Sequence, residues 1–85
     1  MNRPEHVVLL MQSVHQHMVL EEILDRLKIR YRTVVKPRQL GSDCGMAMRI
    51  DTADLDRIRQ ICEHEKLLVF GVFFLVDNRW EPYLG

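Results

Sequence analysis

Residues 31–51, YRTVVKPRQLGSDCGMAMRID, hold two short extended segments separated by a turn, and the rest of the fold is inferred outward from them. Residues 31–36 are β-branched and aromatic, which is typical of a strand. Pro37 ends this segment and has no backbone amide to donate, so we expect the strand at a sheet edge. The run Met, Ala, Met, Arg, Ile over residues 46–50 predicts the next strand.

The segment before this pair predicts a strand followed by a helix. Residues 6–11 form an unbroken apolar run, which suits a central strand covered on at least one face. Apolar residues recur at helical spacing over residues 14–28. Ser13 and Gln16 have the form of a capping box, in which each side chain bonds the other residue's backbone amide, so we expect the helix to begin there.

The segment after the pair predicts a second helix and a last strand. Asp51 or Thr52 can cap the helix. Its expected inner face consists of Leu55, Ile58, Ile61 and Cys62. The apolar run at residues 69–76 is about half the length of a membrane-spanning helix, so we interpret it as a buried strand.

The order strand, helix, strand, strand, helix, strand predicts an α+β fold. The most economical form is a ferredoxin-like βαββαβ sandwich, with a four-stranded antiparallel sheet in the order 4-1-3-2 and two helices on one face. We expect residues 1–76 to form this single domain. Residues 77–85 are expected to be an aromatic C-terminal tail that either folds back on the sheet or forms an association surface.

The charge balance and the number of cysteines argue against several classes of function. Among the 85 residues, twelve basic side chains balance twelve acidic ones, so no overall field draws the chain to nucleic acid or membrane. The basic residues at 26, 28, 30 and 32 could touch RNA, but their acidic neighbours favour a solvated helix end. Two cysteines are too few for a secreted disulfide framework and the N-terminus does not have the form of a signal peptide, so we expect a cytoplasmic protein.

Cys44 lies in a small, polar turn between two glycines, where we expect solvent to reach its thiol. Gly45 can adopt backbone angles closed to other residues and allows close approach. In the predicted fold this turn lies beside the start of the first helix near Ser13, whose free amides would stabilise a thiolate. Cations that could do the same are Lys36, Arg38 and Arg49. The alternative is a small residue packed under the loop, since free cysteine is often buried.

The turn also carries a recognisable pattern. Pro37, Leu40, Ser42, Cys44 and Gly45 are followed by a hydrophobic-small-hydrophobic run, then Arg49 and an acidic residue at position 51. This pattern resembles a family of small bacterial domains described as selenium/sulfur carrier-like proteins, over about residues 6–73. Gly41 departs from it, because a second serine is common at that position.

The resemblance implies that Cys44 carries sulfur or selenium as a persulfide or selenopersulfide. Ser42 and the amides around Gly45 would then hydrogen-bond the anionic chalcogen, and Arg38 would offset its charge. The implied partners are a donor and an acceptor protein. We expect no cofactor and no metal.

Two other functions stay open. In the first, the chain is a non-catalytic interaction module, or a homodimer formed through the last strand and tail, and the 41–45 turn is only structural. In the second, it is a thiol oxidoreductase. We expect no other enzyme, because the sequence has no paired carboxylates, no nucleophile beside an evident base and no phosphate loop.

Two further interpretations concern the other cysteine and the histidines. Cys62 falls on an apolar helix face and is expected in the core, although a redox pair with Cys44 stays open. The four histidines have no i, i+4 pair, which argues against a metal site.

Overall fold

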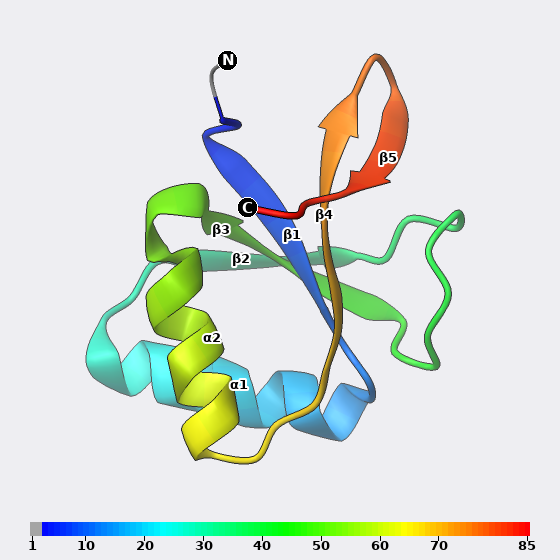
Figure 1. The fold of residues 1–85 in the computed structure, drawn as a ribbon. Coiled ribbons are helices and arrows are strands. Elements are labelled where there is room, and N and C mark those ends of the chain that lie inside the picture. The colour runs from blue at the N-terminus through cyan, green and yellow to red at the C-terminus, as the bar shows by residue number, and fades with distance from the viewer. Residues whose placement is uncertain (1–2) are drawn as a thin grey trace.

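A computed structural model describes residues 3–85. The elements in chain order are β1 (His6–Met11), α1 (Val14–Leu27), β2 (Tyr31–Val35), β3 (Met46–Asp51), a 3-10 turn η1 (Thr52–Asp54), α2 (Leu55–His64), β4 (Val69–Val76) and β5 (Arg79–Pro82) (Figure 1). The predicted α+β class is therefore confirmed, with two helices and an antiparallel sheet. Within residues 3–85, no helix is both long enough and apolar enough to cross a bilayer.

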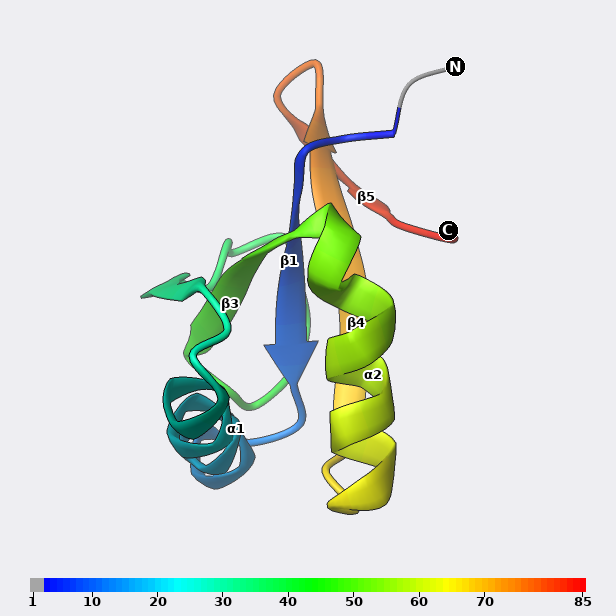
Figure 2. The same cartoon turned by 90° about the vertical axis from the view of Figure 1, so that its left-hand side faces the viewer.

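The sheet has the strand order β2-β3-β1-β4-β5, with every neighbouring pair antiparallel. As predicted, β1 is internal and β2 lies at an edge. The predicted number of four strands is wrong, because residues 79–82 turn back and pair with β4 (Figure 2). The turn is made by Asp77 and Asn78, whose φ values of 49° and 63° suit a two-residue hairpin.

The main core lies between the two helices and one face of the sheet. Alternate residues of β1 point into it, because side chains of a strand alternate between faces. The core is formed by Val7, Leu9, Met11, Leu20, Leu24, Ile29, Met48, Ile50, Leu55, Ile58, Cys62 and Val72. Both helices therefore cover the same face, as predicted, and leave the opposite face of the sheet open (Figure 1).

A smaller cluster lies on the opposite face of the sheet. It consists of Val8, Leu10, Leu40, Cys44 and Ala47, with Val34, Met46, Phe73 and Trp80 packed around it. Its cover is the connection between β2 and β3, residues 36–45, which we call the covering loop. In Figure 1 this loop extends to the right, away from both helices.

The helix starts agree in part with the predicted caps. Ser13 caps α1, and its Oγ accepts from the backbone N–H of Gln16 at 3.3 Å. The reciprocal bond of the predicted capping box is absent, since the Gln16 Oε1 instead accepts from the Leu68 N–H at 3.2 Å. The predicted cap of the second helix is wrong, because the 3-10 turn comes first and Asp51 makes no side-chain cap bond.

Candidate functional site

Cys44 belongs to the covering loop, and its side chain points inward and is 0% exposed. The expectation that solvent reaches this thiol is therefore wrong. Strand β1 presents Val8 and Leu10 to the face that the helices leave open, and the loop folds over these side chains with Leu40 and Cys44 pointing inward. Burying this apolar surface favours the closed loop over an extended turn.

Ser42 makes two hydrogen bonds, one that holds the loop against β1 and one within the loop. The Ser42 Oγ donates to the Met11 carbonyl oxygen at 2.9 Å and accepts from the Cys44 N–H at 3.1 Å. The Cys44 thiol donates to the Met46 carbonyl oxygen at 3.1 Å. The polar groups around the sulfur are thus already paired, and a thiolate would have no proton to donate to Met46.

The cation bonded within the loop is Lys36. Its Nζ donates to the Ser42 carbonyl oxygen at 3.0 Å, and its backbone N–H donates to the Gly45 carbonyl oxygen at 3.0 Å. Arg38, which sequence reasoning favoured as the charge-compensating residue, is exposed and makes no hydrogen bond or ion pair with any residue in 3–85. Lys36 was considered only as one of several nearby cations, since sequence alone does not show which side chain reaches the loop backbone.

Backbone strain falls on Ser42 rather than on a glycine. Ser42 has φ 104°, in a region that residues with a side chain rarely occupy. Gly45 does not have a positive φ, so the turn does not use the backbone freedom that glycine offers there. A Cβ atom at Gly45 would have no atom within 4 Å, so this exposed residue leaves open space beside the site.

Two other predicted site residues lie apart from the thiol. The bond from Ser42 to Met11 places the loop beside the end of β1, as expected, but the Ser13 Oγ is bonded within α1. Arg49 lies two residues after Ala47 on β3, so its side chain is on the same open face of the sheet. The Nη2 of Arg49 forms a hydrogen bond of 3.3 Å with the Nδ1 of His6. The structure therefore brings together Ser42, Cys44 and Gly45, and not Arg38, Ser13 or Arg49.

Cys62 belongs to the main core on the helix side of the sheet. Burial raises the pKa of its thiol to about 11, so it remains protonated at neutral pH. Both cysteines are free, and they belong to clusters on opposite faces of the sheet. The structure thus argues against a Cys44 and Cys62 pair, because a disulfide requires α-carbons within about 7 Å and side chains that face each other.

The sequence of residues 6–73 matches the model of a family described as "Putative Se/S carrier protein-like". The chain belongs to this family. The match spans β1 through the middle of β4 and includes the covering loop and Cys44. No curated protein and no solved structure matches the chain. Family membership connects this protein with selenium and sulfur carriage and with partner proteins.

Sequence reasoning missed the groups that enclose the thiol. The carbonyl oxygens of Met11 and Met46 accept from Ser42 and Cys44, and no residue type signals a backbone acceptor. Leu40 was noted only as part of the motif, although it is the apolar residue of the loop that is buried with Cys44. An apolar residue in an otherwise polar turn was the available signal for this burial.

Proposed function

We propose that the protein carries a single sulfur or selenium atom on Cys44 and stores it beneath the covering loop. The observation that carries this proposal is the position of Cys44 in a chain of this family: its thiol is fully buried, yet only a ten-residue loop covers it. Cys62, in contrast, lies in the main core with a raised pKa.

Loading is a balanced exchange without net oxidation. The Cys44 thiolate attacks the outer sulfur of a donor persulfide, the donor's S–S bond breaks, and a new S–S bond forms on Cys44. The donor leaves as a thiolate with the electron pair of the broken bond. In unloading, a nucleophile of the acceptor takes the outer atom and Cys44 leaves as a thiolate. Selenium in the outer position follows the same scheme.

Loading requires the loop to open, since the closed loop keeps the thiol from any donor. The loop contains no helix or strand and holds a strained residue at Ser42. Segments with few backbone hydrogen bonds lie at the low-stability end of a fold and open locally. We therefore infer that the loop opens without unfolding of the sheet.

Closure after loading protects the carried atom. A persulfide is readily attacked by other thiols, and a buried one is attacked only when the loop opens. The charge of a persulfide anion would be offset by Lys36, whose Nζ bonds the Ser42 carbonyl oxygen. The Ser42 hydroxyl and the Cys44 N–H, which are bonded to Met11 and to each other in the closed loop, would have to exchange these partners to bond the outer atom.

We also infer a ferredoxin-like unit formed by α1, α2 and the first four strands, extended by β5. The observed order of these four strands supports it, because β4-β1-β3-β2 corresponds to 4-1-3-2.

We also propose a cytoplasmic location, because a carrier thiol must stay reduced between cycles of loading and unloading and the cytoplasm is reducing.

Intact-protein mass spectrometry tests the carrier. Wild type, Cys44→Ser and Cys62→Ser are treated with a cysteine desulfurase and cysteine, or with a selenium donor. We expect one added chalcogen in wild type and Cys62→Ser and none in Cys44→Ser. An adduct of equal yield in Cys44→Ser would disprove the assignment.

The complete burial of Cys44 favours one alternative, an interaction module with a structural loop. Strand β4 exposes Phe70 (41%) and Leu75 (54%), which could contact a partner, whereas Trp80 packs on the Cys44 cluster. Under this alternative Cys44→Ser would accept no label and would still bind the partner, while Leu75→Asp would not. Under the carrier proposal Cys44→Ser no longer transfers sulfur or selenium, even if it still binds the partner protein.

A further inference from the structure

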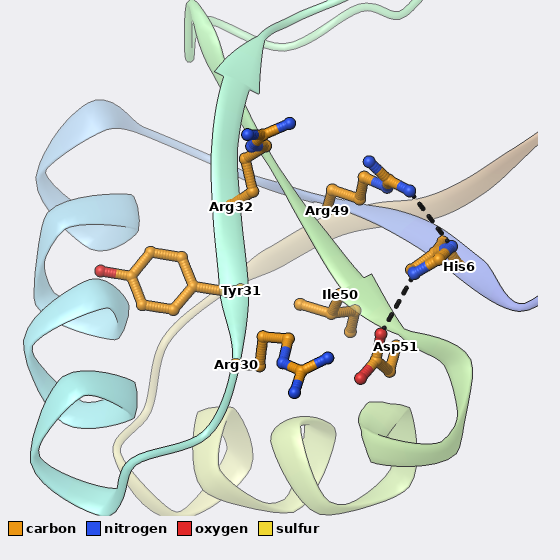
Figure 3. A pocket seen from close by; sticks show the side chains of 7 residues that line it. All are labelled: His6, Arg30, Tyr31, Arg32, Arg49, Ile50 and Asp51. Atoms are coloured by element: carbon orange, nitrogen blue, oxygen red, sulfur yellow. Dashed lines mark hydrogen bonds and ion pairs between the residues drawn. The ribbon is translucent and has the colours of Figure 1, made fainter.

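The open face of the sheet carries a group of arginines beyond the covering loop. Arg32 of β2 and Arg49 of β3 are direct cross-strand partners, so their side chains leave the sheet on the same face. Arg30 precedes β2 by one residue and lines the same pocket as these two arginines, together with His6, Tyr31, Ile50 and Asp51 (Figure 3). In Figure 3 the guanidinium groups of Arg32 and Arg49 project to the same side, with no carboxylate drawn between them.

Carboxylates do little to neutralise the positive charge of Arg30, Arg32 and Arg49. Among residues 3–85, no carboxylate lies within 4.0 Å of a nitrogen of Arg30, Arg32 or Arg49. The carboxylate in the pocket, that of Asp51, is bonded to the Nε2 of His6 at 3.2 Å. Like charges directly opposite each other on a sheet are destabilising, so this arrangement weakens the fold unless an anion occupies it.

Histidine 6 orients Arg49 within the group. A guanidinium can only donate, so the His6 Nδ1 accepts from the Arg49 Nη2 at 3.3 Å, and the Nε2–H donates to Asp51. Asp51, His6 and Arg49 form a chain that fixes one guanidinium, while Arg32 has no such bond. The two arginines therefore present one oriented and one free set of N–H donors.

We propose that Arg32 and Arg49, with Arg30, form a binding site for a phosphate group. Guanidinium groups bind tetrahedral oxyanions through paired, charge-assisted hydrogen bonds. The cavity has a volume of about 240 Å³, below the roughly 300–1,000 Å³ of pockets that take drug-sized ligands. It fits a phosphate group with a small organic part. This site goes beyond sulfur or selenium carriage and does not depend on Cys44.

The same face is a poor match to single-stranded RNA. Sheets that read RNA stack bases on exposed aromatic side chains. Here Phe73 and Trp80 are packed against the Cys44 cluster, and Tyr31 packs against the main core. The net charge of zero also provides no extended attraction for a polyanion. A single phosphate group is the ligand that these residues fit.

Titration calorimetry tests the site with inorganic phosphate, adenosine monophosphate and a short single-stranded RNA as probes, at constant ionic strength set with sodium chloride. We expect wild type to bind inorganic phosphate or the nucleotide with one site per chain. A preference for the nucleotide would identify the source as a phosphate monoester, and equal affinity would identify the free ion. Binding of RNA alone, or of neither phosphate probe, would overturn the proposal.

The variants separate binding from folding. Arg32→Gln and Arg49→Gln should each weaken phosphate binding about tenfold or more, the effect of one lost charge-assisted hydrogen bond. Arg79→Gln, an exposed arginine at the start of β5, is the matched control and should bind as wild type does. Without phosphate, Arg32→Gln should unfold at the same or a higher urea concentration than wild type, because repulsion is relieved.

Two outcomes would count against the assignment. If Arg79→Gln weakens binding as much as Arg32→Gln, the effect reflects overall charge and the site is disproved. If Arg32→Gln lowers stability without phosphate and leaves binding intact, the arginine has a structural role instead. Cys44→Ser should bind phosphate normally, so failure of the carrier proposal would leave this result unchanged.

Discussion

Removing the hydroxyl of Ser42 should expose Cys44 without unfolding the protein. In Ser42→Ala the Met11 carbonyl loses its donor and the Cys44 N–H loses its acceptor, at 2.9 and 3.1 Å respectively. The bond to Met11 exists only while the covering loop is closed, whereas the bond to the Cys44 N–H joins two residues of the loop itself. The substitution keeps the strained φ of 104° at position 42, so nothing in the closed loop compensates for the loss.

The size of the effect follows from the lost bond between the loop and Met11. A buried polar group left without its partner is destabilised by about 1–3 kcal/mol. Because Ser42 is half-buried, water can reach part of the gap, and we use the lower half of this range, about 1–2 kcal/mol. Since 1.4 kcal/mol is a factor of ten, the open population should rise about tenfold.

Alkylation by iodoacetamide under native conditions measures this population, with peptide mass mapping to separate Cys44 from Cys62. The Cys44 rate in Ser42→Ala should exceed that of wild type about tenfold, while the Cys62 rate follows global stability. Ser13→Ala is the matched control, because it removes one serine hydrogen bond at the start of α1 and lowers stability by about 1 kcal/mol.

If the Cys44 rate rises equally in Ser42→Ala and Ser13→Ala, the thiol is reached only by global unfolding. Local opening of the loop would then be wrong, and the loading step of the carrier proposal would lose its physical basis.

Three further predictions concern stability and association. Burial lowers the pKa of His17 more than Glu21 raises it, so the unfolded chain binds more protons and stability should fall as pH drops below the ordinary value of 6.5. Urea unfolding between about pH 7.5 and 5.5 should show this loss in wild type and in the exposed His15→Gln, and a smaller loss in His17→Gln. The raised pKa of Cys62, about 11, predicts stability that is lost as pH rises above the ordinary value of 9.0, and Cys62→Ala should reduce this loss in alkaline urea titrations. A chain ending at Val76 lacks β5 and the edge-to-face contact between the rings of Phe74 and Tyr83, whose centroids are 5.7 Å apart. The freed edge of β4 should then form a concentration-dependent dimer, which sedimentation velocity would detect. A stable monomer would contradict this expectation.

The order of helices and strands could be predicted because each has a local signal. Residues 6–11 are apolar without interruption, and the first helix has both its apolar spacing and a capping serine. Strand β5 escaped prediction because only four residues form it, and its register depends on pairing with β4. The sequence analysis allowed residues 77–85 to fold back on the sheet, but a hairpin strand was not distinguishable from a free tail.

The candidate site was harder to predict because burial is a tertiary property. The polar turn around Cys44 indicated exposure, and the apolar side chains that it covers, Val8 and Leu10, lie more than thirty residues earlier in the sequence. The paired arginines of the open face were read separately, Arg32 as part of a helix end and Arg49 as part of the thiol site. Only the register of β2 with β3 places them side by side.

The most direct measurement follows one labelled atom on and off Cys44. The protein is loaded from a desulfurase with isotopically labelled cysteine, freed of donor, and then mixed with a small thiol acceptor while the label on each cysteine peptide is measured over time. We predict that the label resides on the Cys44 peptide and leaves faster from Ser42→Ala than from wild type. A label found on Cys62, or none retained by wild type after the donor is removed, would contradict storage of the atom beneath the loop.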